Sequence, residues 1–120
     1  MPTIDLDAAF SRITTFWDPH VAGELNGQMV KLAKFKGEFV WHHHENEDEL
    51  FLVHRGEIHL RFRDRTEIVK AGAFIIVPRG VEHQPYAPEV AEVVLFEPAA
   101  TRNTGNVDHA YTREALKSLT

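Results

Sequence analysis

The chain has 120 residues, of which 43% are hydrophobic and 26% charged, which is typical of one globular domain, and no apolar run approaches the ~18 residues that cross a membrane. The formal net charge of −5 and the scattered lysines and arginines argue against nucleic acid as a partner, because binding to phosphates needs clustered cations. Cysteine is absent, which excludes disulfides and thiolate metal ligands.

The first expected element is a short helix over residues 6–17, with Asp5 as its cap. The N-terminal residues contain no basic region followed by an apolar core, so they do not form a secretory signal, and we predict a cytoplasmic protein. The apolar residues that recur at helical spacing are Leu6, Ala9, Phe10, Ile13 and Phe16 or Trp17.

Short strands are expected over residues 20–98. The pair Asn26-Gly27 is a strong signal for a hairpin turn. Further along, glycine and proline separate segments rich in valine, isoleucine, leucine and phenylalanine, which gives about eight strands at a spacing of roughly 8 to 12 residues. This pattern is typical of an antiparallel sandwich or barrel. The clearest segments are VAGEL, QMVKLAKF, FVWHH, ELFLVHR, EIHLRFR, FIIVP and VAEVVLF.

The tail over residues 99–120 begins with a polar stretch and continues into the segment TREALKSL, for which we expect a second short helix. We therefore interpret residues 1–120 as a single all-β domain, with a barrel core over 20–98 and short helical segments at both ends.

Two of the strands differ in how their apolar residues alternate. In EIHLRFR these residues occupy one face, so the other face is polar. In ELFLVHR both faces are apolar. Phe51 and Val53 share the parity of Glu49 and are expected to face the interior, whereas Leu50 and Leu52 point outward and need a cover. We predict a homodimer formed through this surface; the alternative cover is the N-terminal helix.

The stretch FVWHHHENEDELF places three consecutive histidines before an acidic loop. On a strand, His42 and His44 point to one side and His43 to the other, so the H-x-H pair directs two imidazoles at one point. Glu49 begins the next apolar strand and can return beside the pair. His83 follows a proline-glycine turn in the second half of the chain. We therefore predict a four-ligand group of His42, His44, Glu49 and His83.

Other residues of the same types have simpler interpretations. The acidic residues before the apolar strand usually form a solvated loop, with Glu47 as the alternative carboxylate ligand. Arg79, in the turn before His83, is a weak candidate for contact with an anionic substrate, and a solvated turn arginine is the commoner case. Surface or interface roles are expected for the remaining histidines His20, His54, His59 and His109.

Two spacings resemble the paired motifs of the cupin superfamily. The first is Gly37-x4-His42-x-His44-x4-Glu49-x6-Gly56, and the second is Gly72-x5-Pro78-x-Gly80-x2-His83. The resemblance covers roughly residues 26–97. Within the superfamily, the sequence looks most like small single-domain cupins described as mannose-6-phosphate isomerase-like. It departs from the usual pattern at two places. The first glycine is one residue closer to the histidine pair, and Ala87 stands where the second motif usually has asparagine.

The resemblance implies a cupin-type β-barrel, also called a jelly roll or double-stranded β-helix, with one divalent transition metal per subunit and a small-molecule ligand. Three histidines and one glutamate suit Fe, Mn, Co, Ni, Cu or Zn, and they leave positions for water, a substrate or dioxygen. The function implied first is metal-assisted isomerisation or epimerisation of a sugar or small oxo-acid. The alternatives are an Fe(II)-dependent dioxygenase and a non-enzymatic domain that senses a small ligand or a metal.

Overall fold

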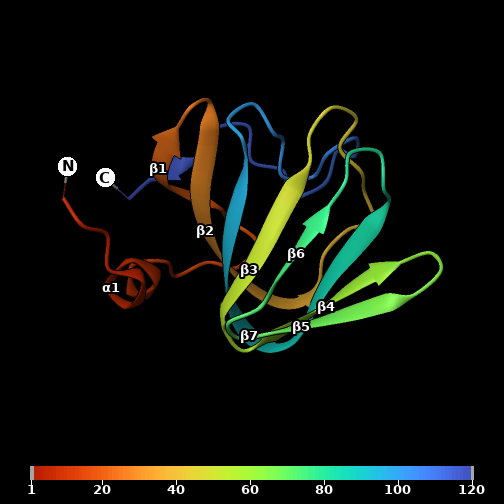
Figure 1. Ribbon diagram of the computed structural model, residues 1–120, viewed down its shortest axis with the longest axis horizontal. Helices are drawn as coiled ribbons and strands as arrows, with labels where there is room; N and C mark the ends of the chain where they lie inside the picture. The colour runs from red at the N-terminus through yellow and green to blue at the C-terminus, as the bar shows by residue number, and fades with distance from the viewer. Residues whose placement is uncertain (1, 120) are drawn as a thin grey trace.

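The computed structural model describes residues 2–119 and consists of one short helix and eight strands (Figure 1). The sequence analysis expected about eight strands, but FVWHH is extended without being a regular strand, and the strand over 66–70 was not identified. The elements are α1 (Leu6–Ser11), β1 (His20–Leu25), β2 (Gln28–Glu38), β3 (Glu49–Arg55), β4 (Glu57–Phe62), β5 (Thr66–Lys70), β6 (Phe74–Val77), β7 (His83–Pro98) and β8 (Lys117–Ser118).

All eight strands belong to one sheet, whose main order is β5-β4-β7-β2-β1-β8, with β3 paired to both β6 and β7. Strand β7 organises it, because its first residues pair with β4 and its later residues pair with both β2 and β3. Every pairing is antiparallel except that of β8 with β1. The fold is therefore all-β, as expected, although the hydrogen-bonded path does not close into a full barrel. In Figure 1, α1 and β1 lie on one side of the molecule, and the β4–β5 hairpin lies on the other.

The expected hairpin turn joins β1 to β2. Leu25 pairs with Gln28, and the two residues between them have positive φ angles of 51° at Asn26 and 79° at Gly27. Positive φ at both central residues is the geometry of a type I′ turn, whose twist matches that of the flanking strands.

The main apolar core fills the interior of the folded sheet. On β3, Phe51 and Val53 are buried together with Glu49, as their parity predicted, while the outward Leu50 and Leu52 are only half-buried. On β4 the alternation also holds, since the apolar residues are buried and the polar ones are not. Each fully buried side chain of this size contributes roughly 1.5–3 kcal/mol to folding. The core therefore does not depend on a metal for most of its stability.

A second apolar cluster lies outside the sheet, where α1 packs against β2. Phe10 and Ile13 are buried there beside Leu32. Asp5 caps the helix, as expected, by accepting a hydrogen bond from the Ala8 N–H at 2.8 Å. The N-terminal helix is thus one cover for the outward face of the sheet, although it does not reach the whole of it.

The helix expected over residues 6–17 is shorter than predicted, because α1 ends at Ser11. Phe16 instead forms a bridge with Lys34, and its side chain remains 42% exposed. Trp17 turns inward and is buried in the main core, stacked on Phe35 at 4.3 Å between ring centroids. Burial of this ring outweighs the weak helical preference of the segment, so tertiary packing overrides the local pattern.

The helix expected over TREALKSL is wrong for the described residues. Lys117 and Ser118 form the short strand β8 instead, beside His20 and Val21 of β1. Leu119 donates its N–H to the Val21 carbonyl at 2.8 Å and is buried in the second apolar cluster. A helix of this length is marginal in water, whereas pairing with an edge strand satisfies backbone groups directly.

Within the described residues, no helix is long and apolar enough to cross a membrane. The cytoplasmic location stays a prediction from the sequence.

Candidate metal centre

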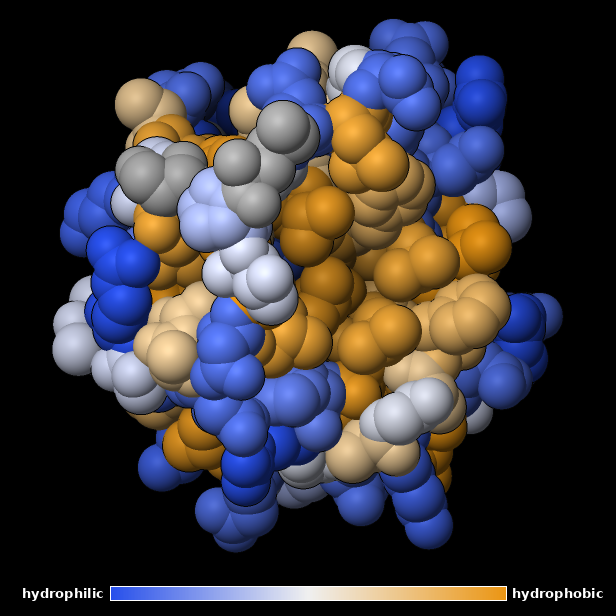
Figure 2. Space-filling model, turned by 60° about the vertical axis from the view of Figure 1, so that its left-hand side comes forward, coloured by the Kyte–Doolittle hydropathy of each residue, from blue (hydrophilic) through white to orange (hydrophobic). Residues whose placement is uncertain are grey.

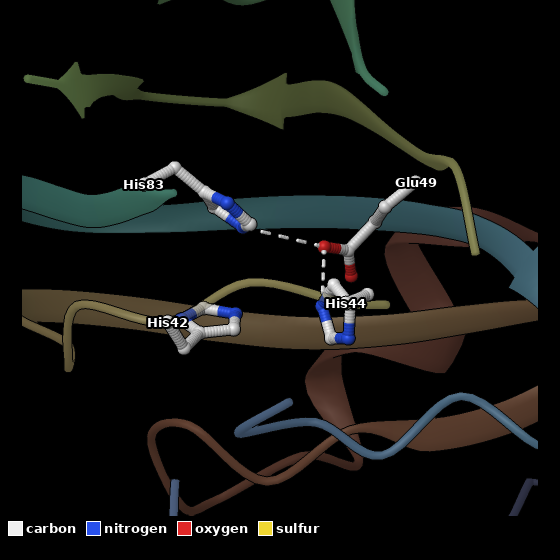
Figure 3. Close-up of side chains that lie close together, drawn as sticks. All are labelled: His42, His44, Glu49 and His83. Carbon is white, nitrogen blue, oxygen red and sulfur yellow. Dashed lines mark ion pairs between the residues drawn. The ribbon is translucent and has the colours of Figure 1, made fainter. Parts of the chain in front are cut away.

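Four buried side chains meet inside the sheet, and they are the four that the sequence analysis selected (Figure 3). His42 and His44 lie on the segment between β2 and β3, Glu49 is the first residue of β3, and His83 is the first residue of β7. Each offers a ligand atom within 4.8 Å of the others. Their exposed fractions are 4% or less, so the group lies in the interior of the protein.

The backbone brings two of the histidines together. The His42 N–H donates to the His83 carbonyl at 3.0 Å, and the His83 N–H donates to the His42 carbonyl at 2.9 Å. This bridge lies beyond the end of β2 and continues the antiparallel pairing of that part of the chain with β7. His43 points away from the group, and its ring lies 2.5 Å from a carboxylate oxygen of Glu45. The alternation predicted for the three consecutive histidines is therefore confirmed even though they do not form a regular strand.

Backbone carbonyls fix the tautomers of two of the rings. His42 Nδ1 lies 2.9 Å from the Val40 carbonyl oxygen, and His83 Nδ1 lies 2.9 Å from the Val81 carbonyl oxygen. A carbonyl oxygen can only accept, so Nδ1 carries the hydrogen in both rings and Nε2 keeps its lone pair. A neutral imidazole held in this way is the form that binds a metal ion.

Several atoms of the group have no hydrogen-bond partner among the described residues. They are both ring nitrogens of His44, Oε1 of Glu49 and Nε2 of His83. Oε1 of Glu49 lies 3.2 Å from His44 Nε2 and 3.7 Å from His83 Nε2. Buried polar atoms in folded proteins nearly always have partners. Three imidazoles and one carboxylate that converge in this way fit a divalent transition metal, which would take up Glu49 Oε1, His83 Nε2 and one of the two ring nitrogens of His44.

Electrostatics keep the group in the protonation states that a cation requires. Burial, and then the neighbouring His83, lowers the pKa of His42 to about 3, so this ring is neutral near pH 7. Burial acts to raise the pKa of Glu49, but its contacts with Glu97, His44 and His83 hold that pKa well below the usual range. The site thus presents a neutral imidazole at His42 and an ionised carboxylate at Glu49.

Glu97, on β7, is a buried carboxyl beside this group that the sequence analysis did not identify. One of its oxygens accepts a hydrogen bond from Lys31 Nζ at 2.9 Å, and both side chains are about 1% exposed. Burial, and then the adjacent Glu49 carboxylate, raises the pKa of Glu97 well above its usual value, while Lys31 opposes this shift. A buried lysine and two buried carboxyls therefore extend the polar interior away from the histidines.

The strand pattern contained a signal for this pair. Lys31 shares the parity of Ala33 and Phe35 on β2, and these two face the interior. Glu97 likewise shares the parity of the buried Leu95 on β7. A single charged residue at an inward position of each strand was the feature that could have indicated a buried ion pair.

Two other predicted candidates lie outside the group. Arg79 is exposed, and Asp48 holds it by accepting from its backbone N–H at 2.8 Å and from its guanidinium at 3.3 Å. Glu47 is half-buried and does not join the four ligand atoms, but it lines a surface hollow that also touches His44. The structure thus places Glu49, and not Glu47, among the histidines.

A second set of ligand-type side chains has a structural explanation. His54 Nε2 lies 2.8 Å from Asp7 Oδ1 and 3.8 Å from Glu92 Oε1. The guanidinium of Arg55 already pairs with the same carboxylates at 3.0 and 3.5 Å. The His54 ring also stacks on Phe10 of α1. This set joins α1 to the sheet, so the contacts of His54 are explained without a metal.

An interior cavity opens from the four-ligand group. His42 and Glu49 line it at one end, together with Glu97, and aromatic side chains, including Trp17 and Phe39, form much of the remaining wall. The cavity has a volume of about 30 Å³, so a molecule of a few atoms would lie in it directly beside a bound metal ion. The arrangement therefore suits chemistry on a ligand that coordinates the metal.

The C-terminal segment over 99–113, which we call the cap, covers the histidine segment. Asn106 receives the His43 N–H at its side-chain oxygen at 2.9 Å and returns its own N–H to the His43 carbonyl at 3.2 Å. Gly105 passes so close that an added Cβ would lie 2.2 Å from the His43 carbonyl oxygen. The cap therefore fixes the backbone between His42 and His44.

Comparison with known proteins assigns the chain to the family whose motifs the sequence resembles. A model of the cupin domain family matches residues 28–97, which is more than half of the chain. Among curated proteins, an uncharacterized protein, YdbB, from Bacillus subtilis is 44% identical over 62 residues, covering 51% of this chain and 55% of the relative. The chain thus spans about half the length of that relative.

Two solved structures are similar over most of the chain. A cupin-2 domain protein from Shewanella frigidimarina is 40% identical, with a TM-score of 0.79 over 80% of this chain and 94% of that one. The protein NMB1881 from Neisseria meningitidis is 26% identical, with a TM-score of 0.75 over 82% of this chain and all of that one. The fold described above is therefore shared with both proteins, the first of which is a solved cupin-2 domain structure.

Proposed function

The chain belongs to the cupin family, and on this premise we propose that it is a metal-dependent enzyme that acts on a small oxygen-bearing molecule. The observation that carries the proposal is the convergence of His42, His44, Glu49 and His83 on one point at the end of an interior cavity. A purely structural metal site would not need an adjoining cavity, and it would more often close itself with cysteine ligands.

The residues of the site have two roles, metal binding and lining of the cavity. The three imidazoles and the Glu49 carboxylate would hold one divalent transition metal, whose contribution is to polarise an oxygen of the substrate. His42 and Glu49 also line the cavity, so the ligand group faces the space where a substrate would lie. The wall of the cavity is largely apolar, which lowers the local dielectric constant and strengthens electrostatic interactions there.

Isomerisation or epimerisation of a carbonyl compound is the reaction class that we favour. Such a reaction moves a proton next to the polarised carbonyl and needs a group outside the metal ligands to accept it. Glu97 is a candidate by position, since it lines the cavity and is not one of the four ligands, and because its pKa is raised, it would accept a proton only after losing its own. The alternatives are a dioxygenase reaction, which consumes dioxygen, and a non-enzymatic sensing role, which consumes no substrate.

Elemental analysis tests the first part of the proposal. We expect about one divalent transition metal per chain in protein purified without an affinity tag, and little metal in a His42→Ala/His44→Ala double variant that remains folded. Equal metal content in the two proteins would contradict the assignment of His42 and His44 as metal ligands. Oxygen uptake and isomerisation of carbonyl compounds, measured on the metal-loaded protein, then separate the enzymatic alternatives.

We also propose that the protein forms a homodimer through the outward face of β3 and β6. Leu50 pairs with Ile76 and Leu52 with Phe74 across these two strands, so the four side chains share one face. Phe74 and Ile76 are 58% and 54% exposed. Figure 2 shows hydrophobic side chains gathered into a broad area of one side of the molecule. An apolar area of this kind on a protein surface commonly marks an interface.

A further inference from the structure

Lys31 is connected to the metal centre through one other buried side chain. Its Nζ lies 2.9 Å from Oε1 of Glu97, and the Glu97 carboxyl in turn contacts Glu49, which is one of the four ligands. The side chains of Lys31 and Glu97 are about 1% exposed, and Glu49 is also buried. The three side chains therefore form one buried row that begins on β2, continues on β7 and ends on β3 at the metal group.

The ammonium group of Lys31 has a second partner, in the cap. It donates to the Thr101 carbonyl oxygen at 3.3 Å as well as to Glu97. Thr101 is itself fixed, because its N–H and its hydroxyl both donate to the Pro98 carbonyl oxygen, at 3.0 and 2.7 Å. A buried ammonium group stays with such partners, since an unpaired charge in the interior is costly. Lys31 therefore fixes where the Glu97 carboxyl lies.

A purely structural role explains little about this ion pair. The pair joins β2 to β7, but these strands already pair along their length through backbone hydrogen bonds. A buried ion pair adds little net stability compared with apolar side chains of the same volume, because both charges lose their hydration. Its distinguishing feature is the contact with Glu49. Partners of this kind orient metal ligands, and their loss commonly lowers metal affinity by about 10- to 100-fold.

We propose that Lys31 is a positioning residue of the metal centre, which acts through Glu97 to hold the Glu49 carboxylate against the histidines. Oε1 of Glu49 faces His44 Nε2 at 3.2 Å and His83 Nε2 at 3.7 Å. A glutamate side chain has several rotatable bonds, so a carboxylate that is already held in place loses less conformational entropy when the metal binds. This inference rests on the metal site of the proposed function and adds a residue to it.

Metal affinity of three variants tests the proposal. Lys31→Met and Glu97→Gln each interrupt the row at one residue, and Lys31→Met/Glu97→Met removes both charges. Competition between the metal-free protein and a chromophoric chelator for Co²⁺ measures the affinity, and each variant should bind Co²⁺ at least fivefold more weakly than wild type. If Lys31 acted only through its charge, Lys31→Met should bind Co²⁺ more tightly, because a nearby cation repels the metal.

The double variant separates positioning from stability. Replacement of a buried ion pair by apolar side chains is often neutral or stabilising, so urea unfolding of metal-free Lys31→Met/Glu97→Met should show a free energy of unfolding close to that of wild type. Its affinity for Co²⁺ should nevertheless stay at least fivefold lower. Recovery of wild-type stability and wild-type affinity together would mean that the pair has only a structural role, which would overturn the inference.

The visible absorption of bound Co²⁺ reports the arrangement of its ligands directly. Its bands should change in Lys31→Met and in Glu97→Gln, because the Glu49 carboxylate is no longer held in the same position. Lys34→Met is the matched control: it makes the same substitution on β2, but Lys34 has the opposite parity to Lys31 and is only partly buried. This control should leave the absorption bands and the affinity unchanged.

The outcomes separate this inference from the proposed function. Wild-type affinity and absorption in both Lys31→Met and Glu97→Gln would overturn the inference, while the four ligands would still support the proposed function. A wild-type protein that takes up no metal would overturn the proposed function and this inference with it. Metal binding is the property measured, so the result does not depend on whether Glu97 also accepts a proton during a reaction.

Discussion

At the scale of single residues, the metal centre depends on the exact position of one carboxylate in an acidic stretch. Glu49 is buried with the histidines because β3 begins there and carries its side chain inward with Phe51 and Val53. Glu47 is two residues earlier and has the same parity, yet it lies at a surface hollow because no strand continues the alternation back to it. The start of regular structure thus decides which glutamate can act as a ligand.

Replacing these two glutamates should therefore have unequal effects. Glu49→Gln replaces a charged ligand with a neutral amide inside the group, and we expect metal affinity to fall by at least an order of magnitude. Glu47→Gln makes the same chemical change outside the group and should alter affinity only slightly. Competition with a chromophoric chelator measures both. A larger loss in Glu47→Gln would show that the acidic segment binds the metal in another arrangement.

His42 should make the metal-free protein sensitive to acid. Its pKa is about 3 in the folded protein, chiefly because of burial, against about 6.5 in an unfolded chain. Between these values the unfolded chain binds more protons, so the contribution of His42 to stability is full above about pH 6.5 and is lost as the pH falls towards 3. The loss is up to about 1.4 kcal/mol per pH unit.

Urea unfolding of metal-free wild type and His42→Gln, at pH 7 and at pH 4.5, measures this effect. The free energy of unfolding should fall less between the two pH values in His42→Gln, because the variant lacks the titrating ring. The comparison between proteins removes the contributions of the other acidic and basic groups. An equal fall in both proteins would mean that burial of His42 does not govern its protonation.

At the scale of elements, the structure of the C-terminal chain, including the cap over residues 99–113, was predicted least well from the sequence. The cupin motifs predicted four ligands that the structure brings together, and strand alternation predicted the inward faces of β3 and β4. Neither pattern reaches beyond Pro98, where the helix predicted for TREALKSL is absent and the chain instead pairs with β1. Long-range pairing of a polar tail with an edge strand leaves no periodic signal, because it is decided by which edge is free.

The same limit explains Trp17 and the Lys31–Glu97 pair. Helical spacing placed Trp17 on an N-terminal helix, but its ring stacks in the core with Phe35, more than a dozen positions away. Lys31 and Glu97 become partners only because β2 and β7 are neighbours, with Lys31 opposite Leu95 and Met29 opposite Glu97. Contacts between strands distant in sequence follow from the topology, which alternation within each strand does not specify.

A glycine in the cap tests whether this element supports the metal centre. In Gly105→Ala, the new Cβ would lie 2.2 Å from the His43 carbonyl oxygen and 3.0 Å from the His42 ring. The cap would have to move away from the histidine segment, so we expect lower thermal stability and weaker metal binding. Thermal unfolding and chelator competition measure the two effects.

Gly72→Ala is the matched control for that substitution. Gly72 also has a positive φ, of 87°, but an added Cβ would meet nothing within 4 Å. This variant therefore carries the backbone strain, roughly 1–2 kcal/mol, without the collision. Gly105→Ala should lose more stability than Gly72→Ala, and it alone should lose metal affinity. Equal metal affinity in the two variants would show that the cap does not position the histidines.

At the scale of the whole molecule, the sheet has one covered outer face and one that is partly bare. Helix α1 covers β2 and its neighbourhood, and the contacts of His54 with Asp7 and Phe10 hold it there. The paired rows of β3 and β6 lie beyond this cover. The interior face of the same strands carries the metal ligand Glu49, so the two faces of β3 have separate roles.

The homodimer proposed through this bare face can be tested with a single charge. Light scattering of the wild type at micromolar concentration should give a mass near twice 13.7 kDa, and Leu52→Glu should give a mass near 13.7 kDa. Metal content should stay unchanged in Leu52→Glu, because the new carboxylate points away from Glu49. Ile68→Glu is the control, since Ile68, on β5, is an apolar residue that is 56% exposed, about as much as Phe74 and Ile76 of the proposed interface. It should leave the mass of the dimer unchanged. A wild-type mass near 13.7 kDa would show instead that α1 and the packing within one chain are a sufficient cover for the sheet.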